Sequence, residues 1–334
     1  MKTIFVVDDN NVNLLSADEA LTDDYNVFTM QSASKMFELF NHIIPDLILL
    51  DILMPEMDGF EALKLLKSNR AYMDIPVIFL TSRNDSATES LGLEMGAVDF
   101  MFKPFSRPVL LNRIKTHLGI EHIIRERTHS LNRLKNCIVS VLSNMVENRD
   151  RMTGRHVERT TRYVRLLLDA MLKRKIYIDE IAGWDVEEVT SSSRLHDIGK
   201  IVITDLILNK PEKLTAEEFE TIKTHTIEGE RIIDSIIAET GDGAFLQNAK
   251  LFAGYHHERW DGSGYPYGLK GGEIPLQGRI MAIADVYDTL VSERPYKKAF
   301  THEKAKEIII ENRGTQFDPN LLDLFIEISD TFPD

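Results

Sequence analysis

Short apolar runs alternate with helical patterns over residues 1–119, and this alternation restricts the fold more than any other feature of the sequence. The apolar runs are Ile4–Val7, Asn26–Met30, Leu47–Leu50, Val77–Leu80 and Phe100–Phe102. Each run is followed by a segment whose apolar residues have helical spacing, and the connections between them are short. This repetition of strand and helix is typical of a doubly wound parallel sheet. We therefore predict an α/β domain over residues 1–119.

Polar side chains stand where four of the predicted strands end. Asp8 and Asp9 follow the first strand, Asp51 ends the third, Thr81 the fourth, and Lys103 follows the fifth. Sites in such sheets form beyond the carboxyl ends of the strands. Three carboxylates at one edge would repel one another, which favours a Mg²⁺ site with one carboxylate left to react. A lysine there supplies a fixed positive charge for an added phosphoryl group.

These residues lie in motifs that resemble the receiver domain of bacterial two-component response regulators. The motifs are Val6–Asn10, Leu50–Gly59, Thr81-Ser82 and Lys103-Pro104-Phe105. The resemblance implies that a sensor histidine kinase phosphorylates Asp51, and that the Lys103–Pro104 peptide is cis. It implies that Mg²⁺ is bound by Asp8, Asp9 and the Leu53 carbonyl, and that the phosphoryl group is contacted by Thr81 and Lys103. Phe100 stands where this family carries its aromatic switch residue.

A heptad pattern occupies residues 120–146. Its apolar members are Ile120, Ile124, Leu131, Leu134, Ile138, Val141 and Met145, and Arg127 fills the remaining heptad position. Steps of four and three residues are typical of a coiled-coil seam. We predict a continuous linker helix that pairs with its copy in a homodimer. An amphipathic helix packed on its own chain is the alternative.

The remaining region, residues 147–334, has helical patterns and an unusual set of polar residues. One predicted helix, Val186–His196, would place Lys200 one turn after His196. Imidazoles and carboxylates gather near the ends or on the apolar faces of the predicted helices: His156, His196, Asp197, His225, His256, His257 and Asp285. Such ligands suit Mn, Fe, Zn or Ni. Seven of them are too many for one ion and predict a two-metal centre. The set contains no cysteine, which argues against a structural zinc cluster.

The surrounding motifs resemble the HD-GYP domain, an all-helical subfamily of the HD metal-dependent phosphohydrolases. The matches are Thr153–His156, His196–Lys200, Lys223–His225, Tyr255–Pro266, Arg279–Asp285 and Arg294–Lys297. Members of this family hydrolyse cyclic di-GMP to linear pGpG, many of them on to GMP, and some prefer cyclic GMP-AMP. The resemblance therefore implies a phosphodiesterase.

The resemblance also implies a role for each matching residue. His156, His196, Asp197 and Asp285 form the basic metal set, His225, His256 and His257 complete a second metal site, and Asp197 bridges the two ions. Lys200 contacts the scissile phosphate, so Asp197 and Lys200 are the expected catalytic residues. Substrate phosphates are held by Arg294 and Lys297. Tyr265, in the Gly264–Pro266 loop, shapes the pocket, and this loop is also a candidate docking surface for partner proteins.

One departure from the family affects the expected number of metals. Some members carry a glutamate one turn before the first histidine and bind a third ion, but Met152 stands there in this chain. A thioether is a poor ligand for such ions, so we expect two. Iron and manganese are the favoured metals, with zinc, nickel and magnesium as alternatives.

Composition sets wider limits on function. A net charge of −14 argues against binding of long nucleic acid. No apolar run approaches the ~18 residues of a membrane span. A single cysteine, Cys137, and a strand at the start of the chain in place of a secretory signal favour the cytoplasm.

Together these features predict a response regulator that hydrolyses cyclic di-GMP. Its parts are a receiver domain (1–119), a linker helix (120–146) and an HD-GYP domain (147–334). The alternatives are a hydrolase of cyclic GMP-AMP or another phosphoester, and a docking module without catalytic activity.

Overall fold

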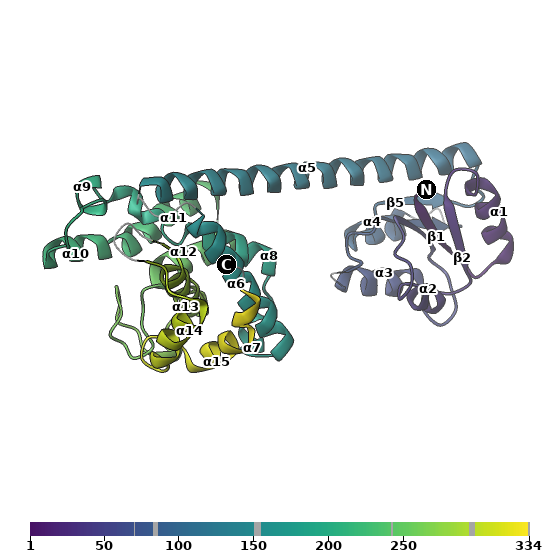
Figure 1. The fold of residues 1–334 in the computed structure, drawn as a ribbon. Helices are drawn as coiled ribbons and strands as arrows, with labels where there is room; N and C mark the ends of the chain where they lie inside the picture. Colours follow the sequence, from purple (N-terminus) through teal and green to yellow (C-terminus); the bar gives the residue numbers. More distant parts are fainter. Residues whose placement is uncertain (70, 83–85, 150–154, 242, 294–297, 333–334) are drawn as a thin grey trace. The chain divides into compact units, whose positions relative to one another are not determined.

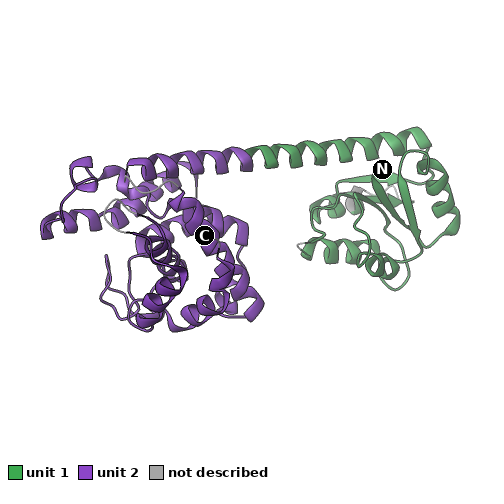
Figure 2. Ribbon diagram, viewed as in Figure 1, with its two compact units in different colours: residues 1–131 green, residues 132–334 purple. Residues whose placement is uncertain are grey.

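The structure is a computed structural model of residues 1–334. It describes the chain except for residues 70, 83–85, 150–154, 242, 294–297 and 333–334 (Figure 1). The chain divides into two compact units, Met1–Leu131 and Asn132–Asp334, which Figure 2 shows in green and purple. No helix among the described residues is long and apolar enough to cross a membrane.

The first unit contains the predicted parallel sheet. Its five strands are β1 (Thr3–Val7), β2 (Asn26–Met30), β3 (Leu47–Asp51), β4 (Val77–Thr81) and β5 (Asp99–Phe102). The strand order is β2-β1-β3-β4-β5, and every neighbouring pair is parallel. The order reverses between β1 and β3, and a doubly wound sheet binds its ligands at such a reversal. The predicted α/β fold is confirmed.

Helices cover both faces of this sheet. They are α1 (Asn11–Leu21), α2 (Ala33–Leu39), α3 (Gly59–Ser68), α4 (Ser86–Glu94) and the start of α5 (Arg107–Arg149). Alternate residues of β1 enter two separate cores, because side chains of a strand point alternately to opposite faces. Ile4 and Val6 pack with α1 and α5, whereas Phe5 and Val7 pack with α2 and α3. The Lys103–Pro104 peptide is cis, as the family resemblance implied.

Helix α5 is one continuous helix of 43 residues. Near its C-terminal end, Val139 and Val146 are buried against Leu195, Ile198 and Ile233. The predicted heptad residues lie on another face, and the exposed fractions of their side chains range from 49% to 66%. Near its C-terminal end, α5 therefore packs on its own chain, as the alternative expected, but it does so through a face other than the heptad seam.

The second unit is helical, as predicted. Its helices are α6 (His156–Arg174), α7 (Ile178–Ile181), α8 (Val186–Ser192), α9 (Asp205–Leu208), α10 (Ala216–Lys223), α11 (His225–Thr240), α12 (Ala244–Tyr255), α13 (Leu276–Val291), α14 (His302–Glu311) and α15 (Pro319–Ile328). Short 3₁₀ helices are η1 (Ser193–Leu195), η2 (Ile198–Val202), η3 (Gly271–Glu273) and η4 (Ser329–Thr331). The main core lies between α6, α13 and α15, around Tyr163, Ile283 and Phe325. The sequence patterns did not predict α7, α9 or α15.

The predicted helix Val186–His196 is wrong at its end. Helix α8 stops at Ser192, and His196 lies beyond the 3₁₀ turn η1. The hydroxyls of Ser192 and Ser193 donate to the carbonyls of Val189 and Thr190, which offers the backbone an alternative to continued α-helix. The chain then turns tightly at Gly199, where an added Cβ would lie 1.9 Å from the carbonyl oxygen of His225. Lys200 therefore follows His196 across a break between two 3₁₀ helices.

Candidate metal centre

Five separate segments of the second unit bring the predicted ligands together. His156 is the first residue of α6, and His225 is the first residue of α11. His196 and Asp197 lie between η1 and η2, His256 and His257 directly follow α12, and Asp285 lies on α13. The four histidines His156, His196, His225 and His256 are at most 2% exposed. Helix ends thus direct a set of imidazoles into the interior of the unit.

The ligand atoms form two groups. His156, His196 and Asp285 each offer one atom within 4.8 Å of the others, and so do His225, His256 and His257.

Asp197 lies between these two groups. Its Oδ2 is 3.4 Å from Nε2 of His196, whereas its Oδ1 is 3.5 Å from Nε2 of His225 and 3.8 Å from Nε2 of His256. One oxygen of the carboxylate therefore faces each group, which is the arrangement that a bridging ligand requires.

The orientation of the imidazoles fits metal binding. Nδ1 of His196, His225 and His256 lies 2.7 to 3.0 Å from backbone carbonyl oxygens, to which it donates. Each Nε2 lone pair is then left to face the centre. Nε2 of His156 and Nε2 of His196 are buried and have no hydrogen-bond partner among the described residues. A buried polar atom without a partner calls for an explanation, and a metal ion supplies one.

The protonation states of His256, His257 and Asp197 fit as well. Burial lowers the pKa of His256 well below its usual range and that of His257 to about 3, which keeps both rings neutral. Burial alone would raise the pKa of Asp197, but Lys200 and the neighbouring His196 outweigh this effect and hold it well below its usual range. A neutral imidazole and an ionised carboxylate are the forms that bind metals.

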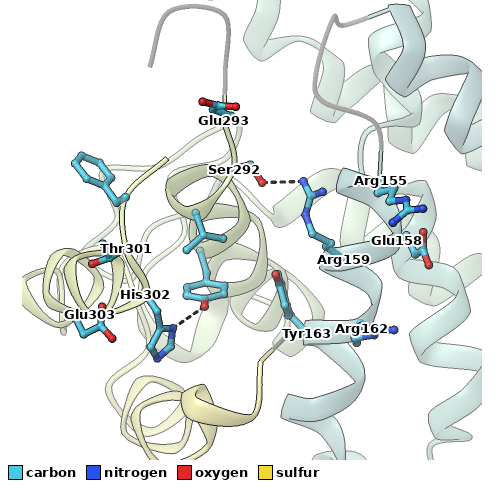
Figure 3. A pocket seen from close by; sticks show the side chains of 13 residues that line it. Arg155, Glu158, Arg159, Arg162, Tyr163, Ser292, Glu293, Thr301, His302 and Glu303 are labelled. Carbon is cyan, nitrogen blue, oxygen red and sulfur yellow. Dashed lines mark hydrogen bonds between the residues drawn. The ribbon is translucent and has the colours of Figure 1, made fainter. Parts of the chain in front are cut away.

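A buried carboxylate that the sequence motifs did not identify holds His156. Oδ2 of Asp288 lies 2.8 Å from Nδ1 of His156, and Asp288 is fully buried. Arg159 donates to both oxygens of Asp288 and also to Ser292, the bond drawn in Figure 3. A usable signal was present in the sequence, because Asp288 lies three residues after Asp285 on an otherwise apolar helix.

Two of the expected substrate-binding residues, Lys200 and Tyr265, lie at the centre, and the other two lie outside the described residues. Lys200 Nζ lies 2.8 Å from Oδ2 of Asp197, so it is at the centre. Tyr265 stacks on His257, with 4.8 Å between ring centroids, and lines a cavity of about 290 Å³ that reaches His256 and His257. Arg294 and Lys297 lie outside the described residues, as does Met152.

The loop that carries Tyr265 is held by Glu258. This carboxylate is 2% exposed and accepts the backbone N–H groups of Tyr267 and Gly268 on Oε1 and of Leu269 on Oε2. Tyr267 also donates to Glu230 on α11. The loop is therefore fixed against the helices that carry the histidines, although Glu258 itself touches no candidate ligand atom.

A larger cavity, of about 730 Å³, is lined in part by Arg159 and Ser292 and is shown in Figure 3. It is lined by Arg155, which precedes α6, by Arg159 and Arg162 of α6, and by three glutamates (Glu158, Glu293, Glu303). The charges of its lining balance, so it has no clear preference for an anion.

The first unit contains the second predicted site. Asp8, Asp9 and Asp51 offer oxygens within 4.8 Å of one another at the carboxyl edge of the sheet. Lys103 Nζ lies 2.5 Å from Asp8 and 2.8 Å from Asp51. Thr81 is buried beside this edge, and Leu53 follows in the loop after β3. Burial raises the pKa of Asp51, although Lys103 opposes this.

Comparisons with known proteins agree with both halves of this description. The model of the response regulator receiver domain matches residues 4–115, and an HD domain model matches residues 140–321. The chain is 40% identical to a "Probable cyclic di-GMP phosphodiesterase" of Vibrio cholerae, over 99% of this chain and 79% of that protein. It is 37% identical to "Cyclic di-GMP phosphodiesterase response regulator RpfG" of Xanthomonas campestris, over 84% and 75% of the two chains. A "3'3'-cGAMP-specific phosphodiesterase 2" of Vibrio cholerae is 39% identical over 58% of this chain and 35% of its own.

Proposed function

The chain belongs to the response regulators that join a receiver domain to an HD domain, and we propose that it is a metal-dependent phosphodiesterase acting on cyclic di-GMP. The observation that carries this proposal is the position of Asp197, with one oxygen toward each group of imidazoles. Relatives that match most of this chain are named for the same activity.

We assign two divalent ions to the centre, with iron or manganese as the favoured metals. One ion would be held by His156, His196, Asp197 and Asp285, and the other by His225, His256, His257 and Asp197. When bound, two such ions stabilise negative charge on the attacking and leaving oxygens of a phosphodiester.

Other residues of the chain hold the substrate. Lys200 is already placed beside the bridging carboxylate, and its ammonium stabilises charge on the phosphate oxygens during the displacement. Tyr265 forms one wall of the pocket next to His257. We assign Arg294 and Lys297 to the remaining phosphate oxygens, because guanidinium and ammonium groups form strong, charge-assisted hydrogen bonds to phosphate.

The receiver controls this activity. A histidine kinase transfers a phosphoryl group to Asp51, with Mg²⁺ held by Asp8, Asp9 and the Leu53 carbonyl. Lys103 and Thr81 contact the added group.

The proposed parts of the chain are the receiver (1–119), the linker helix (120–146) with its exposed seam as a homodimer interface, and the HD-GYP domain (147–334). The loop around Tyr265 is also proposed as a docking surface for partner proteins.

A purified chain stripped of metal tests the activity. We expect no turnover of cyclic di-GMP without metal, and formation of linear pGpG after addition of Mn²⁺ or Fe²⁺, measured by liquid chromatography. His196→Ala should lower turnover at least ~100-fold, because it removes a ligand of the centre. The exposed His42 provides a control, since His42→Ala should turn over like the wild type. A metal-loaded wild type that forms no linear product would refute the proposal.

Cyclic GMP-AMP is the second candidate substrate, because one relative is named for it. Parallel assays of both cyclic dinucleotides at equal concentration decide between them through the ratio of kcat/KM. A ratio in favour of cyclic GMP-AMP would replace cyclic di-GMP in the proposal and leave the metal centre unchanged.

A further inference from the structure

The last turn of α5 contacts the metal centre through a buried carboxylate. Glu147 is 7% exposed, and its Oε1 accepts the backbone N–H of His156 at 2.6 Å. The first N–H groups of a helix have no acceptor within the helix. The N-cap residue of α6, Arg155, makes no capping bond with its side chain. Glu147 therefore caps α6 from another helix, at the residue that carries a candidate ligand.

Two residues later, Arg149 contacts the segment that follows Asp197. Its Nη1 donates to the carbonyl of Ile201 at 2.8 Å, and its Nη2 donates to the carbonyl of Ile203 at 3.0 Å. It also forms an ion pair with Asp205 at 2.9 Å. The two carbonyls belong to η2 and the residue after it, and η2 begins directly after Asp197 and contains Lys200. Arg149 thus fixes the segment that follows the bridging carboxylate.

There is almost no free space between this helix end and the centre. A cavity of about 10 Å³ is lined by Ser143, Val146 and Glu147 of α5 on one side, and by His156, Asp197 and Lys200 on the other. Such a volume holds about one water molecule. The end of α5 is therefore packed directly behind the bridging carboxylate.

We propose that Glu147 and Arg149 are positioning residues of the metal centre, which fix the relative placement of the segments carrying His156 and Asp197. Neither Glu147 nor Arg149 belongs to either group of candidate metal ligands among the described residues. Each acts through a backbone contact: Glu147 on the N-terminus of α6, and Arg149 on the end of η2. This proposal rests on the proposed function only in assuming that the centre binds metal.

Mn²⁺ affinity of the full chain tests the role of Glu147 independently of any substrate. Electron paramagnetic resonance of free Mn²⁺, fitted with a separate site for the receiver carboxylates, gives the Kd of the centre, and thermal unfolding of the metal-free chain verifies that each variant folds. Glu147→Ala removes the acceptor and should raise the Kd roughly tenfold, the usual effect of losing a group that orients a ligand. Glu147→Gln keeps an acceptor oxygen at the same reach and should stay within about threefold of the wild type.

Control variants separate positioning from general loss of stability. Asn148 lies between the two residues and is exposed, so Asn148→Ala should bind Mn²⁺ like the wild type. If Glu147→Ala does not fold, Glu147→Asp replaces it, because the shorter carboxylate cannot reach the His156 N–H and should also weaken binding. A folded Glu147→Ala with the wild-type Kd would overturn the proposal. So would a Glu147→Gln variant as weak as Glu147→Ala, since charge rather than the hydrogen bond would then matter.

Arg149 is tested in the same way. Arg149→Ala frees both carbonyls and should raise the Kd several-fold, up to roughly tenfold. Asp205→Asn removes only the exposed ion pair and should leave the Kd unchanged, because exposed ion pairs contribute little. Equal effects of the two substitutions would contradict a role for the carbonyl contacts. Unaltered Mn²⁺ binding in all variants would refute the positioning role, whereas failure to cleave any cyclic dinucleotide would refute only the proposed function.

Discussion

At the scale of single residues, Asp288 determines which nitrogen of His156 faces the metal centre. Its carboxylate accepts from Nδ1 of His156 and from the guanidinium of Arg159. The pKa of Asp288 lies below its usual value, because the hydrogen bonds from His156 and Arg159 outweigh the effect of burial. An ionised Asp288 accepts only, so Nδ1 must carry the proton and Nε2 is free for a metal.

Replacement of Asp288 by asparagine should reverse this arrangement. The amide oxygen would turn toward Arg159, which can only donate, and the amide N–H would face Nδ1 of His156. The proton of His156 would then move to Nε2, so Mn²⁺ affinity should fall roughly tenfold or more. The Kd measured by paramagnetic resonance checks this. Asp234→Asn is the control, since Asp234 pairs with Lys250 at the surface. Equal affinities in the two variants would contradict the role of Asp288.

The sequence identified the ligands but not the residues that orient them. Several imidazoles and carboxylates together near helix ends and on apolar faces are unusual, so His196, Asp197 and Asp285 could be selected by residue type and position. Glu147 belongs to an ordinary helical pattern, and the spacing of Asp288 from Asp285 does not say what Asp288 contacts. Their roles follow from contacts with His156, which lies 132 positions from Asp288 and nine from Glu147. Contacts of this kind depend on how helices pack, which residue spacing does not specify.

At the scale of elements, the loop after α12 depends on one carboxylate. Both oxygens of Glu258 are occupied by backbone N–H groups of residues 267–269, and the buried position excludes water as a replacement. Leaving such a group unpaired costs about 1–3 kcal/mol. The wall of the pocket that Tyr265 forms therefore relies on this anchor.

Glu258→Gln should loosen only one of the three bonds. Its amide oxygen can still accept from Tyr267 and Gly268, but its amide nitrogen would face the N–H of Leu269. Residue-resolved hydrogen exchange should show faster exchange at Leu269, with little change at the other two amides. Glu258→Ala is the comparison and should release all three. Unchanged exchange at Leu269 in the glutamine variant would show that Glu258 does not hold the loop.

The start of β5 is tied to α5 by a second kind of contact. Asp99 accepts from Arg113 Nη1 at 2.5 Å and lies 3.1 Å from Nε2 of His117. Burial alone would raise the pKa of Asp99, but Arg113 and His117 outweigh it and hold the pKa below its usual value. The ionised carboxylate thus stabilises the folded receiver at pH values above the pKa that Asp99 has in the unfolded chain. That stability is lost as the pH falls through the lower, folded value.

Calorimetry of the full chain tests this sign. Between about pH 5 and pH 3, the melting temperature of the receiver should fall more steeply for the wild type than for Asp99→Asn, which has no proton to bind. Above about pH 5 the wild type should be the more stable of the two. Parallel curves for both proteins would show that Asp99 does not contribute to the acid sensitivity.

The elements themselves were largely predictable, and the exceptions have physical reasons. All five strands were located from apolar runs, because a sheet covered on both faces requires them. The end of α8 was placed too late, since the hydroxyls of Ser192 and Ser193 bond to backbone carbonyls and favour a break in the helix before its apolar pattern ends. Short helices such as α7 and α9, with four residues each, are too brief to show a period.

At the scale of the whole molecule, α5 belongs to both compact units. It begins in the receiver, where Leu110 and Ile114 enter the core, and ends at Arg149, beside the metal centre. The sequence predicted the helix and its heptad pattern. It did not predict that a different face, with Val139 and Val146, packs on the second unit. Helix α5 thus has two apolar faces. One packs on the second unit, and the other, the heptad seam, is exposed and available for a further partner.

We expect that partner to be a second copy of the chain, because a seam of alternating three- and four-residue steps pairs with its own copy in a parallel coiled coil. Leu131 lies on the seam, and its side chain is 66% exposed. Leu131→Glu would place two carboxylates opposite each other in the dimer, which is unfavourable without a counter-charge. Light scattering at micromolar concentration should give about twice the chain mass of 38.2 kDa for the wild type and the mass of one chain for the variant. Asn132→Glu is the control, because it adds the same charge one position off the seam and should remain dimeric. A monomeric wild type would exclude the seam as the interface. Equal dissociation of both variants would exclude it as well.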